Sequence, residues 1–271
     1  MLTRIDWLPD LGRRTRIMGI LNVTPDSFSD GGRFDAEGPA LAHAAAMVAE
    51  GADLIDVGGE STRPGAVPVP AEEEIRRIAA VVQALAAQSA VPVSIDTYKA
   101  ATARAALQAG ARMVNDVWGL QREPAIAEVA ATFGVPVVIM HNRTEADPVL
   151  DIVDDIRRFF DTSLAIARRA GIPERHIVLD PGIGFGKTRA QNLAVLARLP
   201  EIKALGFAVL VGASRKSLVA ASMDHPPRER LYETLAGHVL AAAGGADILR
   251  VHDVREHVDA LRVVDAVRGA G

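Results

Sequence analysis

The run Arg16-Ile-Met-Gly-Ile-Leu-Asn-Val23 is almost wholly apolar and ends beside a polar side chain, and seven later runs share this arrangement. Continuous apolar strands are typical of parallel sheets that are buried on both faces. Ala-rich stretches with helical spacing separate most of the runs. We therefore predict an α/β fold, a (β/α)8 TIM barrel, which typically takes about 250 residues. The expected strands are Arg16–Val23, Asp53–Gly59, Pro92–Thr97, Met113–Val117, Val135–Asn142, Ile177–Gly182, Ala208–Ser214 and Ala246–Val254.

Helices are expected between these strands. Asp96-Thr97 and Asp151 occupy N-cap positions, where a side-chain oxygen accepts hydrogen bonds from free backbone N–H groups. Gly51, Gly110 and two further glycines, Gly134 and Gly171, follow helical stretches and suit the left-handed conformation that ends many helices. The expected helices are Gly38–Glu50, Ala71–Gln88, Lys99–Ala109, Pro124–Phe133, Ile152–Ala170, Ala190–Leu199, Lys216–Met223, Arg228–Ala243 and Val254–Val267.

Composition limits the kind of protein this chain can be. The chain has 271 residues and a net charge of −4, so it offers no basic face for a nucleic-acid backbone. It has no cysteine, which excludes disulfides, thiolate metal sites and a cysteine nucleophile. No apolar run approaches the roughly 20 residues that span a bilayer, and the N-terminus lacks a signal core. We expect one soluble, unprocessed cytoplasmic domain over 1–271, with the barrel at about 16–268 and no membrane partner.

Polar residues follow each expected strand. In a TIM barrel, the carboxyl ends of the strands and the loops after them form the active face. Long loops rich in Gly and Pro follow the first two strands, and they are expected to be mobile. The sequence therefore predicts an active site at this end of the barrel. The polar strand-end residues are Asn22, Asp56, Asp96, Asn115, His141, Asp180, Ser214 and His252.

The segment Asp180-Pro-Gly-Ile-Gly-Phe-Gly-Lys-Thr188 looks at first like a phosphate-binding loop. A Walker A loop needs a glycine five positions before Gly186, where this chain has Pro181, which has no backbone N–H. We therefore expect no ATP hydrolysis. The glycines suit a flat ligand that lies against the backbone beside Phe185, with Asp180 as a hydrogen-bond acceptor.

A second segment, Ser214-Arg-Lys-Ser217, is expected to end the seventh strand and begin a helix whose free N–H groups attract an anion. A solvated helix face is the alternative interpretation. Alternation along the eighth strand places Arg250 and His252 on one side, and Arg63 from the second loop adds a third cation. This cluster suits a phosphate or diphosphate.

Asp96, Asn115 and Asp180 end neighbouring strands, and each could simply cap a buried turn. Together with Lys216 they match a heterocycle that has N–H donors on one edge and acceptors on another. Asp56 lies deeper and is expected to be structural. No His-Glu-x-x-His spacing or nucleophile elbow occurs, which disfavours a histidine metal site or a serine triad. The remaining histidines are expected on surfaces or helix faces, and these are His43, His176, His225, His238 and His257.

These motifs resemble the dihydropteroate synthase family over nearly the whole chain and in the family's order. The matching segments are Asn22-Val-Thr-Pro-Asp-Ser-Phe-Ser-Asp-Gly-Gly32, Asp56-Val-Gly-Gly-Glu-Ser-Thr-Arg-Pro-Gly65, Ser94-Ile-Asp-Thr97, Asn115-Asp116, Met140-His141, Leu179-Asp-Pro-Gly182, Gly184-Phe-Gly-Lys187, Ser214-Arg-Lys-Ser217 and Arg250-Val-His-Asp-Val254.

The resemblance implies a transferase of folate biosynthesis, which joins 6-hydroxymethyl-7,8-dihydropterin diphosphate to 4-aminobenzoate and releases diphosphate. It implies that diphosphate leaves first, that the arylamine then captures a cationic pterin methylene, and that loops one and two close over the site. It also implies Mg²⁺ as cofactor and a homodimer through outer helices. The pterin residues so implied are Asp96, Asn115, Met140, Asp180, Phe185 and Lys216.

The same resemblance assigns the other two parts of the site. Asn22 would also supply an oxygen to Mg²⁺, while Lys216, Arg63, Arg250, His252 and Asp30 would serve catalysis. The implied diphosphate residues are Asn22, Thr62, Arg63, Arg250 and His252, and the implied aminobenzoate residues are Phe28, Thr62, Arg63, Pro64, Phe185 and Ser217.

This chain departs from the family pattern in two places. After His141 it reads Asn-Arg-Thr-Glu-Ala-Asp147, and Trp118 follows shortly after the pterin-binding Asn115. Two other functions remain open: a related pterin-binding methyltransferase, and a non-catalytic paralogue that binds pterin or serves as a scaffold. Neither function requires all of the cationic residues of the predicted site, and this chain has all of them.

Overall fold

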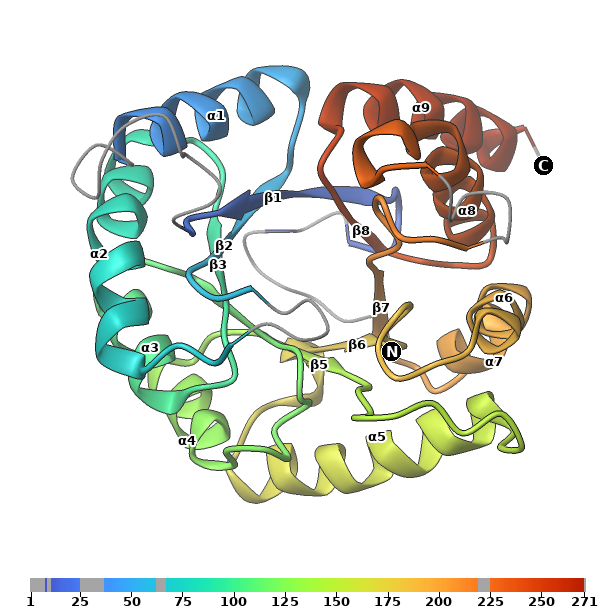
Figure 1. Ribbon diagram of the computed structural model, residues 1–271, viewed down its shortest axis with the longest axis horizontal. Coiled ribbons are helices and arrows are strands. Elements are labelled where there is room, and N and C mark those ends of the chain that lie inside the picture. Colours follow the sequence, from blue (N-terminus) through green and yellow to red (C-terminus); the bar gives the residue numbers. More distant parts are fainter. Residues whose placement is uncertain (1–7, 9–10, 25–36, 62–66, 219–224, 271) are drawn as a thin grey trace.

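The computed structural model describes residues 8, 11–24, 37–61, 67–218 and 225–270. Its eight parallel strands form a closed barrel in sequence order, and β8 pairs with β1 to complete it. The helices surround the strands (Figure 1), which confirms the predicted (β/α)8 fold. The strands are β1 (Arg16–Asn22), β2 (Leu54–Gly58), β3 (Val93–Asp96), β4 (Met113–Asp116), β5 (Val137–Met140), β6 (Ile177–Asp180), β7 (Ala208–Val211) and β8 (Ile248–Val251).

Strict alternation along the strands separates the inside of the barrel from its outside. Met18, Leu54 and Val178 belong to a buried cluster inside the barrel, whereas their neighbours Ile17 and Ile55 pack in the larger cluster beneath the helices. Most strands are therefore apolar on both faces below the mouth, as a covered parallel barrel requires. The exception is β3, whose interior-facing residues are Ser94 and Asp96. The residue two positions after an interior residue also faces the inside of the barrel. At the carboxyl ends of the strands, these next inward-facing residues are mostly polar and line the mouth.

The helices mostly follow the predicted intervals. Asp151 caps α5 by accepting from Val153 N (2.9 Å) and Asp154 N, and Gly134 ends α4 with a positive φ of 64°. The helices are α1 (Glu37–Glu50), α2 (Ala71–Gln88), α3 (Ala100–Gln108), α4 (Ala125–Phe133), α5 (Ile152–Arg169), α6 (Arg189–Ala197), α7 (Leu199–Lys203), α8 (Leu231–Ala243) and α9 (Val254–Gly269), with 3-10 turns at Glu174–His176 and Pro227–Glu229.

Three predictions about local structure were wrong. Lys99, and not Asp96-Thr97, is the N-cap of α3, and the Asp96 carboxylate binds Arg250 instead. The expected helix over 190–199 is divided into α6 and α7 at Arg198, just before Pro200. No helix begins at Lys216, because residues 214–218 form a turn and irregular chain; residues 219–224 lie outside the described part.

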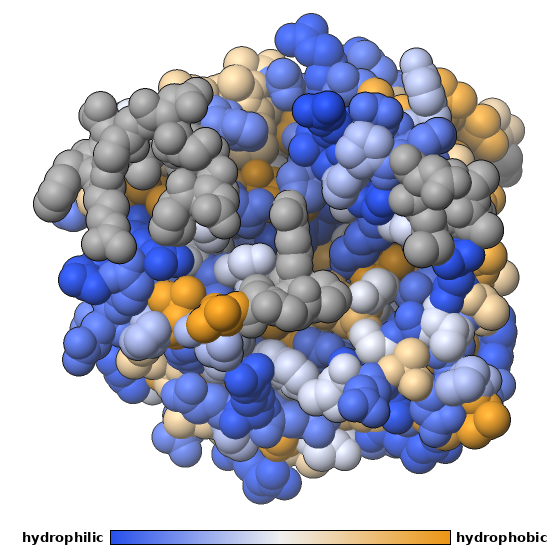
Figure 2. Space-filling model, viewed as in Figure 1, coloured by the Kyte–Doolittle hydropathy of each residue, from blue (hydrophilic) through white to orange (hydrophobic). Residues whose placement is uncertain are grey.

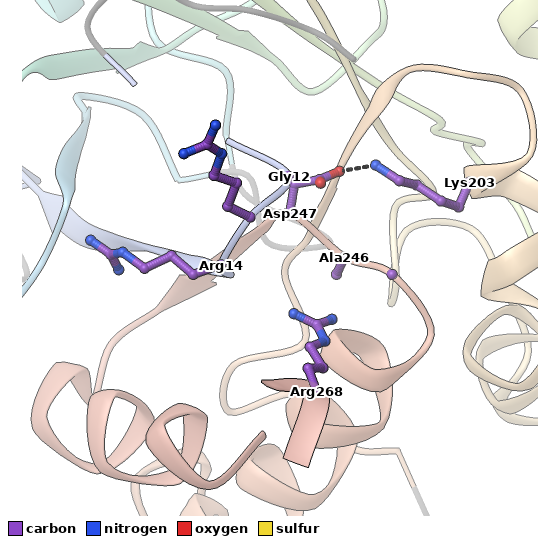
Figure 3. Close-up of a pocket in the computed structure, with 8 residues that line it drawn as sticks. Gly12, Arg14, Lys203, Ala246, Asp247 and Arg268 are labelled. Carbon is purple, nitrogen blue, oxygen red and sulfur yellow. Dashed lines mark hydrogen bonds and ion pairs between the residues drawn. The ribbon is translucent and has the colours of Figure 1, made fainter. Parts of the chain in front are cut away.

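The amino-terminal end of the barrel is held by ion pairs. A cavity of about 160 Å3 lies there among Gly12, Arg14, Lys203, Asp247 and Arg268 (Figure 3). Lys203 Nζ lies 2.5 Å from Asp247 Oδ2, and Arg14 pairs with Asp53. Charges at this end are thus satisfied within the chain, which fits a stabilising role rather than chemistry.

The outer surface in the view of Figure 2 is largely hydrophilic, with small separated apolar areas. Among the residues that the structure describes, no helix combines the length and apolar content that crossing a bilayer needs.

Candidate active site

The mouth of the barrel is lined by the inward-facing side chains nearest the carboxyl ends of the strands. They lie two residues after the interior apolar layer, as Asp56 follows Leu54 and Asp180 follows Val178. This spacing brings together side chains from six strands that are far apart in the sequence. The layer consists of Asp56, Asp96, Asn115, Met140, Asp180 and Arg250.

Arg250 joins two buried carboxylates across the barrel. Its Nε donates to Asp56 Oδ2 at 2.6 Å, and its Nη2 donates to Asp96 Oδ2 at 2.7 Å. Asn115 Nδ2 donates to the same Asp56 oxygen at 2.9 Å. Asp56 is fully buried and orients both partners through Oδ2, which fits the structural role expected of it, while its Oδ1 has no hydrogen-bond partner among the described residues. Arg250 was expected to join Arg63 and His252 in an anion-binding cluster; in the structure its guanidinium also binds two carboxylates.

The carboxylates of this layer differ in how much of their hydrogen-bonding capacity is used. Asp96 Oδ1 is buried and has no hydrogen-bond partner among the described residues. Burial raises the pKa of Asp96 to about 7, and neighbouring Asp56 adds to this rise while Arg250 opposes it. Burial also raises the pKa of Asp180, whose Oδ1 accepts from Gly182 N at 2.7 Å. Asp96 Oδ1 thus offers an unused acceptor to a ligand.

Lys216 enters the mouth from the loop after β7. Its Nζ donates to Ile183 O (2.5 Å) and Gly212 O (2.7 Å) and lies 4.4 Å from the centre of the Phe185 ring. Burial lowers the pKa of Lys216 to about 8, although Asp180 counteracts this. A Cβ on Gly184 would meet the Lys216 side chain at 2.9 Å. We expected these glycines to make room for a ligand, but Gly184 makes room for Lys216.

An apolar wall borders these polar groups. Met140 and Phe185, both expected to contact the pterin, pack in one cluster with Tyr98, Val117 and Trp118. A flat ring can lie against such a wall while its edges face carboxylates and amides. Val117 was not among the predicted site residues; it lies in the turn directly after β4 and joins the wall by packing with Tyr98 and Met140. Trp118 belongs to the wall, so this departure from the family pattern changes its surface.

The segment Ser214–Ser217 is organised differently from the prediction. Arg215 N donates to Thr234 Oγ1 (2.9 Å), and Lys216 N donates to Ala213 O (3.1 Å). These N–H groups are thus used within the chain, and no helix N-terminus here attracts an anion. Ser214 Oγ instead lies 2.9 Å from His252 Nδ1, which fixes His252 at the mouth; Ser217 is half-buried nearby.

His141 was expected to face a ligand, and this prediction was wrong. It lies one residue beyond Met140, and alternation turns it away from the barrel interior. It is fully buried, with Nε2 3.2 Å from Asp155 Oδ2 and Nδ1 2.7 Å from Lys187 Nζ. Lys187 Nζ also donates to Gly182 O at 2.8 Å. Lys187 therefore stabilises its own loop.

The remaining histidines behave unequally. His43 and His225 are exposed, as expected, and His176 is half-buried. His238 and His257 lie on helices, in line with the expected surface or helix-face positions, but the faces that carry them are buried where α8 and α9 pack against each other.

Asn22 ends β1 at the mouth and is half-buried. A Cβ on Gly58 would lie 3.8 Å from Asn22 Oδ1 and 3.7 Å from Asp96 Oδ2. The Asn22 amide oxygen and the Asp96 carboxylate thus lie on the same side of Gly58. Both are ligand types that Mg²⁺ accepts, but Asp96 Oδ2 already accepts from Arg250. No group of three or more His, Cys, Asp or Glu suited to a metal occurs in the described ranges.

Five predicted site residues lie outside the described part of the chain. They are Phe28, Asp30, Thr62, Arg63 and Pro64.

Comparison with known proteins identifies the family. The sequence model of the pterin binding enzyme family matches residues 18–252. The dihydropteroate synthase of Synechocystis sp. is 47% identical, over 98% of this chain and 93% of the relative. The structure is similar to that of Xanthomonas albilineans dihydropteroate synthase with 4-aminobenzoic acid (TM-score 0.93, 46% identity, 99% of each chain covered). It is also similar to that enzyme in complex with 7,8-dihydropteroate (TM-score 0.86, 45% identity, 94% of each chain covered). This chain belongs to the dihydropteroate synthase family of pterin-binding transferases.

Proposed function

We propose that this chain condenses 6-hydroxymethyl-7,8-dihydropterin diphosphate with 4-aminobenzoate and releases diphosphate. One observation carries the proposal: buried Asp96, Asn115 and Asp180 lie in one layer beside Lys216 and an apolar wall. The test is an assay of diphosphate release with purified protein and both substrates. Folded protein that releases no diphosphate above background would refute the proposal. The solved relatives bind 4-aminobenzoic acid and 7,8-dihydropteroate, which favours this reaction over methyl transfer or a scaffold role.

The polar layer suits a pterin. The second oxygen of Asp180 accepts from a ring N–H and amino group, while Lys216 donates to the acceptor edge of the ring. Asp96 Oδ1, which lacks a hydrogen-bond partner in the described part of the chain, provides a further acceptor, and Asn115 is held in place by Asp56. Met140 and Phe185 contact the face of the ring. Burial of these groups makes recognition strict, because an unsuitable ligand leaves them unpaired.

The diphosphate lies between the pterin layer and the loops. Asn22 and His252 face it from the ends of β1 and the β8 loop. Arg63 and Thr62, which lie outside the described residues, are assigned to it on the family's motif alone. Arg250 supports it from below, with 20% of its side chain exposed while it holds both carboxylates. Diphosphate leaves first, and these cations stabilise the charge that develops on it. The lone pair of the arylamine then bonds to the cationic pterin methylene, and the resulting ammonium loses one proton to the departed diphosphate or to water. Because that ammonium is a strong acid, no strong general base is required.

Magnesium fits the oxygen atoms at this place. Asn22 Oδ1 is the protein oxygen that would hold it, together with substrate phosphates, as is normal for this ion. When bound, Mg²⁺ supplies positive charge that favours departure of the diphosphate.

Replacement of Lys216 by alanine is expected to reduce kcat/KM roughly 10- to 100-fold, because a charged donor to the buried pterin is lost. Since the pKa of Lys216 is about 8, wild-type activity should also fall as the pH rises through 8 and the ammonium loses its proton. Steady-state kinetics between pH 6 and about 9.5 measure both effects.

The Lys216→Arg variant keeps its positive charge at high pH, so its activity should not fall as the pH rises through 8. Lys203→Ala is a matched control at the opposite end of the barrel. If Lys216→Ala retains wild-type kinetics, Lys216 does not contact substrate.

The 4-aminobenzoate pocket is assigned to Phe28, Thr62, Arg63, Pro64, Phe185 and Ser217, with Asp30 beside the amine. Most of these residues come from loops one and two. We expect the pocket to be complete only when pterin and diphosphate are bound, so these ligands with Mg²⁺ should raise 4-aminobenzoate affinity roughly tenfold or more. Calorimetric titration with and without them measures this effect, and equal affinities would mean a preformed pocket.

Phe28→Ala and Asp30→Asn should raise the KM for 4-aminobenzoate while pterin affinity in the free protein stays unchanged. A weaker pterin affinity in either variant would contradict ordered closure.

We also propose a homodimer through the outer helices. Exposed Tyr232 and Leu240 on α8 and Val263 and Val267 on α9 are suited to an interface that leaves the mouth free. Sedimentation velocity should show a dimer, and a monomer at micromolar concentration would exclude it. One domain over the whole chain and a cytoplasmic location stay predictions.

A further inference from the structure

A pair of buried histidines connects the two loops that carry Lys216 and His252. His238 lies on α8 and His257 on α9, and each is 1% exposed. His238 Nδ1 lies 2.8 Å from His257 Nε2, and their rings meet edge to face at 61°. Two imidazoles in direct contact in a buried place need a defined proton arrangement, because each ring nitrogen is then a donor or an acceptor, not both.

The neighbouring backbone groups determine that arrangement. Ala213 N–H can only donate, and it lies 2.9 Å from His238 Nε2, so this nitrogen carries no proton. In a neutral ring the proton is therefore on His238 Nδ1, which donates to His257 Nε2. His257 Nδ1 must then carry its own proton, and it donates to Asp253 O at 2.5 Å. One chain of three hydrogen bonds runs in a single direction from Ala213 to Asp253.

The two ends of this chain lie in the active-site loops. Ala213 lies between Gly212, whose carbonyl accepts from Lys216 Nζ, and Ser214, whose hydroxyl contacts His252. Asp253 directly follows His252, and its carboxylate receives two hydrogen bonds from Arg215. The Ser214 and Arg215 contacts also join the loops. The histidine pair adds a connection whose two side chains are both almost completely buried.

Protonation of either ring would break a bond in the chain. A proton on His238 Nε2 would oppose Ala213 N–H, and a proton on His257 Nε2 would oppose His238 Nδ1–H. The charged groups that face the pair also matter: Lys216 and His252 disfavour a charge on His238, while Asp253 and Glu256 favour one on His257. Burial outweighs the effect of Asp253 and Glu256 and lowers the pKa of both histidines, so both rings stay neutral at neutral pH.

We propose that His238 and His257 are positioning residues, which hold the loops after β7 and β8 in the register that places Lys216 and His252 at the substrate. The geometry carries this inference, which rests on the proposed function. Neither histidine contacts a reacting atom, so their influence passes through the Ala213 amide and the Asp253 carbonyl. Wild-type turnover tests the proposed function by itself, and the proton arrangement can be measured without any turnover.

The first experiment measures the tautomers in the wild-type protein. Nitrogen-15 NMR of the imidazole rings should show both histidines neutral at pH 7, each with its proton on Nδ1 and a bare Nε2. A charged ring, or a proton on His238 Nε2, would overturn the proposal.

The second experiment separates hydrogen bonding from packing. His238→Leu removes the acceptor for Ala213 N–H, whereas the Oε1 atom of Gln in His238→Gln can reach the same place. We expect kcat/KM for the pterin diphosphate to fall roughly tenfold in His238→Leu, since one buried donor is left unpaired, and to recover largely in His238→Gln. His257→Leu should resemble His238→Leu, and the double variant should be no worse than either, because the chain is broken once.

Leu261→Ala is the matched control. Leu261 is buried on α9 one turn after His257 and takes no part in the chain. It should lower the melting temperature and leave kcat/KM unchanged. An equal kinetic loss in Leu261→Ala, or no recovery in His238→Gln, would show that the pair acts only by packing and would overturn the proposal. If His238→Leu does not fold, the tautomers and His238→Gln still decide the question.

Discussion

Replacement of Arg250 by methionine is expected to lower the free energy of unfolding by about 3–5 kcal/mol, since it removes the partner of buried carboxylates. Asp56 is fully buried and Asp96 nearly so, and both lose their hydrogen bonds to the guanidinium. Chemical denaturation measured by circular dichroism gives this quantity. The same variant should lose turnover, because the layer that binds pterin is no longer ordered.

The loss should depend on pH in a defined direction. The pKa of Asp96 is about 7 in the folded protein, above the ordinary value of 3.8, so folding favours its protonated form. Its unfavourable contribution to stability therefore grows as the pH rises from about 4 to 7. Arg250 counteracts this rise in pKa, and without it the pKa of Asp96 moves higher still. Arg250→Met should thus be closer to wild-type stability at pH 5 than at pH 8.

Two further variants distinguish charge from packing. Asp96→Asn together with Arg250→Met should recover part of the lost stability, because one buried charge is removed along with its partner. Arg250→Lys should be intermediate, since a single ammonium cannot bridge both carboxylates in the same way. If Arg250→Met is as stable as the wild type at pH 8, the two carboxylates are not held by Arg250.

The barrel and most of its mouth could be predicted because side-chain alternation is a local property of a strand. Asp96, Asn115 and Asp180 were expected at strand ends and lie in one inward-facing layer. The same period of two, extended one residue past Met140, would have turned His141 away from the site. The error arose because His141 was assigned to the site from its position at a strand end, without asking whether the alternation of side chains pointed it inward or outward.

Other features depend on contacts that leave no local signal. Arg250 and Asp56 are 194 residues apart, so nothing near either one indicated their pairing. The loop after β7 was predicted to be helical, but Thr234 on α8 accepts its Arg215 N–H from outside the segment. His238 and His257 are likewise buried only because α8 and α9 pack together and bring the two rings into contact, which the sequence of either helix alone does not indicate.

Asp180→Asn is expected to weaken pterin binding by about 2–4 kcal/mol and to leave the fold intact. Asp180 Oδ1 accepts from Gly182 N, and the amide oxygen of asparagine can keep this bond and the loop shape. The second atom changes from an acceptor to a donor, so it opposes the ring N–H and amino group of the pterin instead of binding them. Asp180→Ala should show a loss of similar size, but it also leaves Gly182 N–H unpaired.

Isothermal titration calorimetry with a pterin measures the change, and Asp247→Asn is the matched control. Asp247 is also a buried carboxylate that accepts a backbone N–H, from Val209 at 2.7 Å, but it lies at the opposite end of the barrel. It should lose stability and keep its pterin affinity, whereas Asp180→Asn should keep stability and lose affinity. Because the two substitutions are chemically identical, a similar effect of both on pterin affinity would mean that Asp180 acts through the fold and not through contact with the ring.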